Sequence, residues 1–496
     1  MTKQTAILAI DQGTTSSRAI LFSTSGEPLQ TRQKELPLTH PHKGWVEQNP
    51  EDIWNDTLWA CQELIDYADN NNIEIACIGI TNQRETTIIW DRTTGKPIYN
   101  AIVWQDRRTA EFCQDLKKKD LEPQITSKTG LLLDPYFSST KIRWILDNVE
   151  GAQKKAKNGE LAFGTIDSFL LWRLSKGKTH ATDITNASRT MLFNIQTEEW
   201  DKDILQWLDI PKSLLPEVKE NAHHFTTTDK TILGKEIPIT GIAGDQQAAT
   251  VGQACFETGM IKSTYGTGCF ALMNIGDTFK QSKNKLLTTI AYKINGKTTY
   301  ALEGSIFIAG AAIQWLRDNL KIIGDAAETE EIANSVPDNN GVYFVPAFTG
   351  LGAPYWNPDA KAAIMGLTRE SNAAHIIRAA LEAQSYQTLD LMEAFKTDSG
   401  IEPERIRADG GLINNKFVGQ HLADMLNLPI DIPQITETTA LGAAYLAGLQ
   451  TGIYKDLNDI TKNWSQRTEF KPHMPQDLRE NNCKEWKKCV ELVNQN

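Results

Sequence analysis

The chain has 496 residues, which is too long for one ordinary hydrophobic core, so the sequence predicts two or more domains. Hydrophobic residues make up 40% of the chain and the formal net charge is −11, which suits a soluble globular protein and argues against non-specific binding of nucleic acid. Lys3 is not followed by an apolar stretch long enough for an export signal, and no later stretch reaches the length of a membrane span. We therefore expect a cytoplasmic protein without an integral membrane segment.

The cysteines are scattered and form no C-x-x-C pair. Their number, seven, is odd, which does not suit a complete set of disulfides. We expect free or buried thiols in a reducing compartment rather than disulfides or a zinc site.

The first predicted element is a β-hairpin with a polar tip. The apolar runs Ala6–Ile10 and Ala19–Phe22 are short and aliphatic, as expected of strands, and they flank the segment DQGTTSSR. A glycine in a turn lets backbone amides approach an anion, hydroxyl groups add donors, and Arg18 adds positive charge. The Asp11 carboxylate repels phosphate unless a divalent cation such as Mg²⁺ lies between them. The tip is interpreted as a metal–phosphate site, with a polar surface hairpin as the alternative.

A helix and a second strand pair follow. Pro50–Ala68 has apolar residues at helical spacing, with proline in the first turn. Ile75–Trp90 predicts a strand, a polar turn and another strand. The turn places Arg84 beside Glu85, one hydrogen-bond donor and one acceptor, which suits a polyol; a structural ion pair is the alternative.

Another helix is predicted over Ser138–Val149, with Ser138 or Ser139 as its N-cap. Aromatic side chains in this part of the chain and beyond it are candidates for a pocket wall, with the hydrophobic core as the alternative: Trp104, Tyr136 and Phe270.

A candidate catalytic carboxylate lies near the middle of the chain. Gly241–Ala249 places Asp245 among glycine and glutamine residues at the start of a predicted helix. A carboxylate there can accept a proton from an alcohol as a general base. An ordinary helix N-cap is the alternative.

The pattern of the first hairpin returns in Gly259–Ile275, where a Gly-Thr tip again lies between two apolar runs. Two such tips can hold a triphosphate from both sides, and they predict two related halves, 1–250 and 251–496, with the boundary near Val251. Chance similarity of a short stretch is the alternative at this point.

The C-terminal part contains the longest helical pattern, Ser371–Phe395, which begins with a Ser-Asn cap signal. Ala408–Phe417 predicts a strand that ends in Asp409, then a glycine pair and a helix, where a nucleotide's sugar and base can approach; an ordinary strand–turn–helix link is the alternative. Strands and helices alternate along the whole chain, which predicts an α/β fold. Neither hairpin tip has a Walker-type phosphate loop or a dinucleotide fingerprint.

Taken together, these segments resemble the FGGY family of carbohydrate kinases. The stretches that carry the resemblance are DQGTTSSRA, GITNQRET, NAIVWQDRRT, DPYFSSTKIRWILDN, TNASRTMLFNI, GIAGDQQAA, STYGTGCF, PAFTGLGAPYW and DGGLINNKF. They run in the family's order from about Ala6 to about Gly452, and Tyr136–Asn148 and Ala362–Glu382 are similar to its two signature patterns. The resemblance implies two actin-like, ribonuclease-H-like domains beside a catalytic cleft. It also implies ATP-dependent phosphorylation of glycerol to sn-glycerol 3-phosphate, with Mg²⁺, by a homodimer or homotetramer.

The resemblance also implies a role for particular residues. Phosphate or metal contacts fall to Asp11, Thr14, Thr15, Ser16 and Arg18. The rest of the nucleotide site falls to Thr267, Gly310, Gln314, Gly411 and Asn415. The glycerol site falls to Arg84, Glu85, Trp104, Tyr136, Asp245, Gln246 and Phe270. Asp245 is the implied catalytic base, and Asp11 and Asp245 are the implied metal ligands.

Two alternatives remain open from the sequence. One is an FGGY kinase for another polyol or sugar, against which the Arg84–Glu85 pair argues. The other is an actin-like structural or chaperone ATPase, which needs the phosphate hairpins but no polyol pocket.

Overall fold

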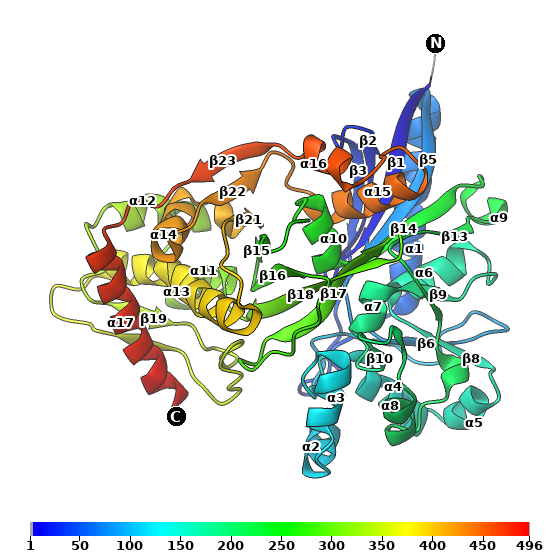
Figure 1. Cartoon of the computed structure of the whole chain (residues 1–496), viewed down its shortest axis with the longest axis horizontal. Coiled ribbons are helices and arrows are strands. Elements are labelled where there is room, and N and C mark those ends of the chain that lie inside the picture. Colours follow the sequence, from blue (N-terminus) through cyan, green and yellow to red (C-terminus); the bar gives the residue numbers. More distant parts are fainter. Residues whose placement is uncertain (1–2, 496) are drawn as a thin grey trace.

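The structure is a computed structural model that describes residues 3–495, and it is built around two large mixed β-sheets (Figure 1). Within these residues the N-terminal sheet has six strands in the order β13-β14-β5-β1-β2-β3, and the C-terminal sheet has seven in the order β17-β18-β16-β15-β21-β22-β23. The strands of the first sheet are β1 Gln4–Gln12, β2 Ser16–Ser23, β3 Pro28–Glu35, β5 Ile73–Asn82, β13 Ala222–Thr227 and β14 Pro238–Gly244. Those of the second are β15 Ile261–Tyr265, β16 Cys269–Gly276, β17 Leu287–Ile294, β18 Lys297–Ile306, β21 Ile406–Asp409, β22 Ile430–Pro433 and β23 Gln466–Phe470.

The two sheets share one arrangement of strands. In each, a hairpin (β1–β2 or β15–β16) is extended on one side by an antiparallel strand, β3 or β18. On the other side its first strand pairs in parallel with β5 or β21, which pairs in parallel with β14 or β22. The similarity of the two hairpins therefore extends to both sheets, and the expected two-domain α/β fold is confirmed.

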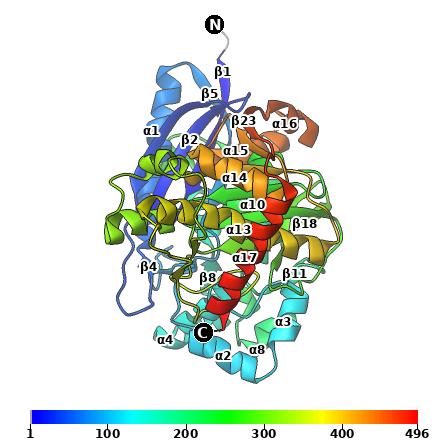
Figure 2. The same ribbon diagram turned by 90° about the vertical axis from the view of Figure 1, so that its left-hand side faces the viewer.

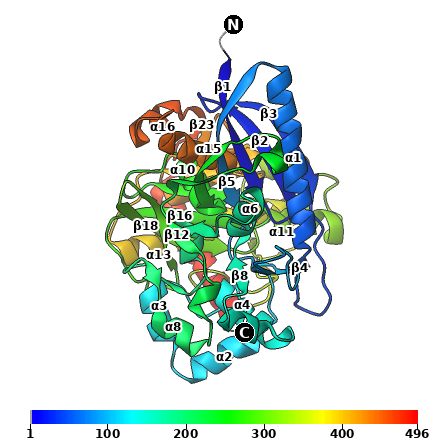
Figure 3. The same cartoon turned by 90° about the vertical axis from the view of Figure 1, so that its right-hand side faces the viewer.

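Each face of the N-terminal sheet is covered by a helix. The helix α1, Pro50–Asn70, runs along one face of this sheet (Figure 3). Side chains alternate along β1, so Leu8 and Ile10 pack in one cluster with α1. Ile7 and Ala9 pack in another cluster with α15, Thr438–Gln450. That second cluster also contains residues of the C-terminal sheet and of α10, Asp245–Gly252. The helices α10 and α15 thus lie in a core shared by the two sheets.

The C-terminal sheet is covered by α13, Ala373–Ser399, and the last helix packs over it. The helix α17, Gln476–Asn494, lies across α13 (Figure 2). Trp486 of α17 stacks on Tyr386 of α13 with ring centroids 5.2 Å apart. The Trp486 indole donates a hydrogen bond to the buried Asp390 carboxylate of α13 over 2.9 Å.

The remaining elements are short. The further helices are α2 Ala110–Lys118, α3 Glu122–Thr129, α4 Ser138–Asn148, α5 Ala152–Lys157, α6 Ile166–Leu174, α7 Ile184–Ser188, α8 Lys202–Trp207, α9 Lys230–Leu233, α11 Gly310–Trp315, α12 Thr329–Asn334, α14 Lys416–Leu426 and α16 Leu457–Asn463. The paired short strands are β4 Glu47–Gln48 with β7 Ala101–Ile102, β6 Ile88–Asp91 with β8 Leu161–Gly164, β9 Ala181–Asp183 with β12 Glu217–Lys219, β10 Phe193–Asn194 with β11 Glu199–Trp200, and β19 Tyr343–Val345 with β20 Ala363–Met365.

Most local predictions are confirmed. The helices α1 and α13 lie where the periodicity places them, and Asn372 caps α13 with its side chain. The N-cap predicted for α4 is wrong: the helix is preceded by Phe137, and the Ser138 hydroxyl instead donates to the backbone carbonyl of Glu85 over 3.0 Å. The cysteines of the described chain are free thiols. Within residues 3–495 no helix combines the length and the apolar character that crossing a membrane requires.

Candidate active site

The tip of the first hairpin is a tight turn between β1 and β2. The amide of Gly13 donates to the carbonyl of Ser16 over 2.9 Å, and the exposed Thr15 lies between them. Thr14 is fixed by two side-chain hydrogen bonds. The Gln48 side chain donates to its carbonyl over 2.6 Å, and the Trp104 indole donates to its hydroxyl over 2.9 Å. The residues of this tip that are predicted to contact phosphate therefore form one ordered loop.

Asp11 and Arg18 face each other across this hairpin. They are partners in the strand register, and their side chains form an ion pair. Arg18 also pairs with Glu437, with 2.6 Å between Nη1 and Oε2. Its charge is thus balanced by two carboxylates, and Asp11 is oriented by a cation of its own sheet.

The aromatic residues singled out in the sequence form one wall. The ring of Trp104 lies edge-to-face with Tyr136 at 5.6 Å and with Phe270 at 6.4 Å between centroids. Because Trp104 also holds Thr14, and Phe270 belongs to β16 of the second hairpin, this wall joins the two hairpins.

Arg84 and Glu85 lie on the turn that follows β5, and both are buried. Glu85 has a φ of +60°, a left-handed conformation that costs energy for a residue with a side chain and that clusters at functional sites. Its carbonyl accepts hydrogen bonds from Thr87 and Ser138 over 3.1 and 3.0 Å, which stabilise the turn.

A buried lysine supports the same turn. The ammonium group of Lys141, on α4, donates to the carbonyl of Tyr136 over 2.6 Å and to that of Glu85 over 3.4 Å. Burial lowers the pKa of Lys141 to about 7, although the Glu85 carboxylate opposes this shift. Lys141 therefore ties Tyr136 of the aromatic wall to the Arg84–Glu85 turn.

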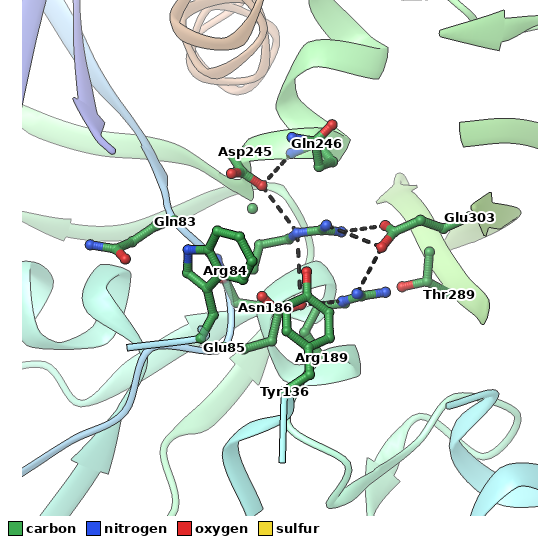
Figure 4. A network of polar contacts seen from close by, with 12 residues as sticks. Gln83, Arg84, Glu85, Tyr136, Asn186, Arg189, Asp245, Gln246, Thr289 and Glu303 are labelled. Carbon is green, nitrogen blue, oxygen red and sulfur yellow. Dashed lines mark hydrogen bonds and ion pairs between the residues drawn. The ribbon is translucent and has the colours of Figure 1, made fainter. Parts of the chain in front are cut away.

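Asp245 is the first residue of α10 and follows the buried strand β14. Its Oδ1 lies 3.0 Å from Nε of Arg84 and accepts from the amide of Gln246 over 2.7 Å (Figure 4). The side chain is 33% exposed, unlike that of Arg84 at 2%. Burial by the surrounding protein raises the pKa of Asp245 to about 6, against the lowering effect of Arg84. The site thus presents a carboxylate with an accessible, basic oxygen.

Gln246 is anchored from the C-terminal half. Its side-chain carbonyl accepts a hydrogen bond of 2.5 Å from Lys262, which is completely buried on β15. Lys262 therefore connects the start of α10 to the strand that leads into the second hairpin tip.

The second tip is packed against the start of α11. The amide of Gly310 donates to the carbonyl of Gly266, and the amide of Ala309 donates to the carbonyl of Thr267, both over 2.9 Å. A Cβ at Gly310 would lie 2.7 Å from that Gly266 oxygen, so only glycine allows this approach. Thr267 and Gln314 are exposed beside this contact.

The other predicted nucleotide residues follow β21, which pairs in parallel with β15. Gly410 has a φ of +99° and packs on the backbone of Tyr265, next to the second tip. Gly411 is exposed, with open space around its Cα, and Asn415 caps α14 and donates to Thr329 over 3.1 Å. Carboxyl ends of parallel strands are where α/β sheets bind ligands.

Two further charged residues complete the site, and like Lys141 and Lys262 they were assigned no role from the sequence. Arg189, after α7, pairs with Glu85 over 2.6 Å, and Glu303, on β18, pairs with Arg189 over 2.8 Å and with Arg84 over 2.5 Å (Figure 4). The signal available in the sequence is a lone charge inside a segment of apolar and hydroxyl residues, TNASRTMLF for Arg189 and YALEGSIF for Glu303.

The predicted metal ligands do not form a complete site by themselves. Asp11 pairs with Arg18 and Asp245 with Arg84, and across residues 3–495 no group of three or more His, Cys, Asp or Glu side chains is arranged to hold a metal ion. Mg²⁺ in kinase sites usually takes one or two carboxylates together with substrate phosphates and water, and the carboxylates of Asp11 and Asp245 are donors of that kind.

Comparisons with known proteins agree with this geometry. Residues 6–252 match the N-terminal domain and residues 261–451 the C-terminal domain of the FGGY family of carbohydrate kinases. A glycerol kinase of Nitrosomonas eutropha is 59% identical over 99% of both chains, and one of Alkaliphilus oremlandii is 58% identical over 98% of this chain and 96% of its own.

Comparison with solved structures agrees with the family match. A Plasmodium falciparum glycerol kinase with ADP superposes with a TM-score of 0.95 at 39% identity, over 99% of this chain and 98% of that one. A gluconate kinase from Lactobacillus acidophilus has a TM-score of 0.89 at 23% identity, again over 99% and 98%, which bears on the fold alone. The chain belongs to the FGGY family of carbohydrate kinases.

Proposed function

We propose that this protein transfers the γ-phosphoryl group of ATP to glycerol and releases sn-glycerol 3-phosphate. The observation that carries the proposal is the partly exposed Asp245 carboxylate, held 3.0 Å from the buried Arg84 on the turn that Lys141 links to Tyr136 of the aromatic wall. The relatives that are 59% and 58% identical to this chain are glycerol kinases, and the superposed Plasmodium falciparum enzyme contains ADP. An actin-like ATPase without a polyol substrate has no need for this carboxylate–guanidinium arrangement.

In the proposed reaction glycerol lies with its carbon atoms against Trp104 and Phe270. Arg84 donates to its hydroxyl oxygens, and Glu85 and Asp245 accept from its hydroxyl protons. Asp245 takes the proton of the terminal hydroxyl as that oxygen attacks the γ-phosphorus in line and the bond to the ADP oxygen breaks. A carboxyl group with a pKa of about 6 is ionised at neutral pH and is a stronger base than an ordinary aspartate.

The phosphate groups of ATP are proposed to lie between the two hairpin tips. Thr14, Thr15, Ser16 and Arg18 contact them from the first tip, and Thr267 does so from the second. Gly310, Gln314, Gly411 and Asn415 complete the nucleotide site. Hydrogen bonds within the protein already order both hairpin tips, so the tips lose little conformational entropy when the phosphates bind.

Asp11 and Asp245 are the proposed carboxylate ligands of Mg²⁺, with phosphate oxygens and water completing its coordination. When bound, the ion supplies positive charge to the phosphate oxygens. The guanidinium groups beside both carboxylates fix their orientation, as supporting side chains generally do at metal sites.

The two halves are proposed to divide the work, with residues 1–250 binding glycerol and phosphate and residues 251–496 binding the nucleotide. We further propose a cytoplasmic homodimer or homotetramer. Sedimentation velocity of the purified protein measures the assembly, and a monomer at micromolar concentration would contradict that part of the proposal.

The substrate is tested with the purified protein, ATP and Mg²⁺ against a panel of glycerol, xylulose, ribulose, gluconate and erythritol. We expect turnover that depends on glycerol. Turnover with another member of the panel instead would preserve the kinase activity but overturn the assignment of Arg84 and Glu85. ATP hydrolysis that ignores every member would favour the actin-like alternative.

A further inference from the structure

Glu303 occupies an internal strand of the C-terminal sheet, next to its edge strand β17. It lies on β18, opposite Leu272 of β16 on one side and Leu287 of β17 on the other. Its side chain is completely buried, and the next residue, Gly304, packs against Leu391 of α13. The backbone that carries this carboxylate is therefore held by strands and a helix of the C-terminal half.

Both oxygens of this carboxylate bind arginines of the N-terminal half. Oε2 accepts from Nη1 of Arg84 over 2.5 Å, and Oε1 accepts from Nη2 of Arg84 over 3.2 Å and from Nη2 of Arg189 over 2.8 Å. This bidentate contact with Arg84 fixes the plane of its guanidinium group as well as its position. The Nε of Arg84 lies 3.0 Å from Oδ1 of Asp245 and 3.8 Å from Oε1 of Glu85.

Arg189 links Glu303 to Glu85 and so fixes the Glu85 carboxylate as well. Its Nε donates to Oε1 of Glu85 over 2.6 Å, while its Nη2 is held by Glu303. The charges therefore alternate around a closed ring of Glu85, Arg189, Glu303 and Arg84, and Asp245 joins this ring at Arg84 (Figure 4). Two members of this network, Glu85 and Asp245, are proposed substrate-binding carboxylates, and Glu303 comes from the other half of the molecule.

Stability alone does not account for such a cluster. Removing charged groups from water costs several kcal/mol for each ion, and well-packed apolar residues often replace a buried ion pair without loss. Loss of one member, in contrast, leaves its partners charged and unpaired. A cluster of this kind is useful where side chains must be held in one orientation.

We propose that Glu303 is a positioning residue for the polyol pocket, fixing Arg84 directly and Glu85 through Arg189. The inference rests on the proposed function, because Arg84 and Glu85 are assigned there to the hydroxyl groups of glycerol. It makes hydroxyl recognition by the N-terminal half dependent on a carboxylate of the C-terminal sheet.

The test compares the wild type with Glu303→Gln, which keeps the shape and removes the charge, and with Glu303→Asp, which keeps the charge. Asp390→Asn is the matched control, because Asp390 is also a buried carboxylate of the C-terminal half but binds Trp486. Steady-state kinetics give KM for glycerol and for ATP, and titration calorimetry gives Kd for ADP.

We expect Glu303→Gln to raise KM for glycerol about ten- to a hundredfold, the effect of losing hydrogen bonds to a charged group. The ADP Kd and the ATP KM should stay within about threefold of wild type. A general disturbance of the fold would raise both of these constants together with KM for glycerol, so unchanged values exclude that explanation. Glu303→Asp should recover part of the loss, and Asp390→Asn should leave KM for glycerol unchanged.

A folded Glu303→Gln variant with wild-type KM and kcat for glycerol would overturn the inference. So would an equal loss of affinity for glycerol and ADP, which indicates a purely structural role. If this variant does not fold, the charge-balanced double variant Arg189→Gln with Glu303→Gln is measured against the same thresholds. A wild-type protein that does not phosphorylate glycerol rejects the proposed function instead, so the two failures are distinct.

Discussion

The guanidinium of Arg84 lies 3.0 Å from the carboxylate of Asp245, yet only Arg84 is fully enclosed by protein. The pair therefore combines a fixed cation with a base that substrate can reach. Because the remaining Arg84 nitrogens are held by Glu303 and Gln247, the cation cannot turn away when Asp245 gains a proton.

The central role of Asp245 predicts the effect of Asp245→Asn. An amide accepts hydrogen bonds from glycerol but does not act as a base, so kcat should fall about 10²–10⁴-fold. Glycerol and ATP affinity, measured by calorimetry, should change little. An Asp245→Asn variant with full turnover would remove this residue from the mechanism.

The hydrogen bond between Trp104 and Thr14 predicts coupling between the aromatic wall and the first hairpin tip. Trp104→Phe and Thr14→Val each remove one partner of that bond, and each should lower kcat/KM for glycerol about fivefold. The double variant should be little worse than either single variant, with a coupling energy of about 1 kcal/mol. Fully additive losses would show that the two residues act independently.

The close contact of Gly310 with Gly266 predicts a defect confined to the nucleotide. A methyl group at position 310 forces α11 away from the second tip, so Gly310→Ala should raise KM for ATP about tenfold. Gly324→Ala is the control, because a Cβ there meets only the flexible side chain of Glu328. Equal effects of the two substitutions on ATP would argue against a special role of this contact.

Asp390 predicts a pH dependence of stability outside the site. Burial raises the pKa of this carboxyl to about 7, above its value in the unfolded chain. The folded state therefore holds the proton more tightly, so this group's contribution to stability falls as the pH rises from about 4 to about 7.

Asp390→Asn removes that loss, because the amide stays neutral and still accepts from Trp486. From pH 5 to pH 8 its free energy of unfolding should rise relative to wild type by about 1–3 kcal/mol. Urea denaturation at both pH values measures the difference, with the exposed Asp359→Asn as control. A difference that does not change with pH would place the pKa of Asp390 in its ordinary range.

The sequence was sufficient to predict the elements that carry local signals. Both hairpins, the helix that begins at Asp245 and the cap of α13 follow from periodicity and turn chemistry. The cap predicted for α4 failed because the Ser138 hydroxyl is used by a carbonyl 53 residues away. Local propensity cannot foresee such a partner.

The same limit applies to the charged network. Glu303 meets Arg189 across 114 positions of sequence, and the contact depends on the register of β18 against β16 and β17. No local pattern encodes that register, so a lone buried charge in the sequence indicates a partner without identifying it.

The most direct test of the account is ³¹P NMR of the purified protein incubated with ATP, Mg²⁺ and glycerol. We predict that the phosphate-ester signal of sn-glycerol 3-phosphate grows in step with ADP and that both disappear when glycerol is omitted. Formation of ADP and inorganic phosphate without the ester, at a rate independent of glycerol, would contradict the proposed function.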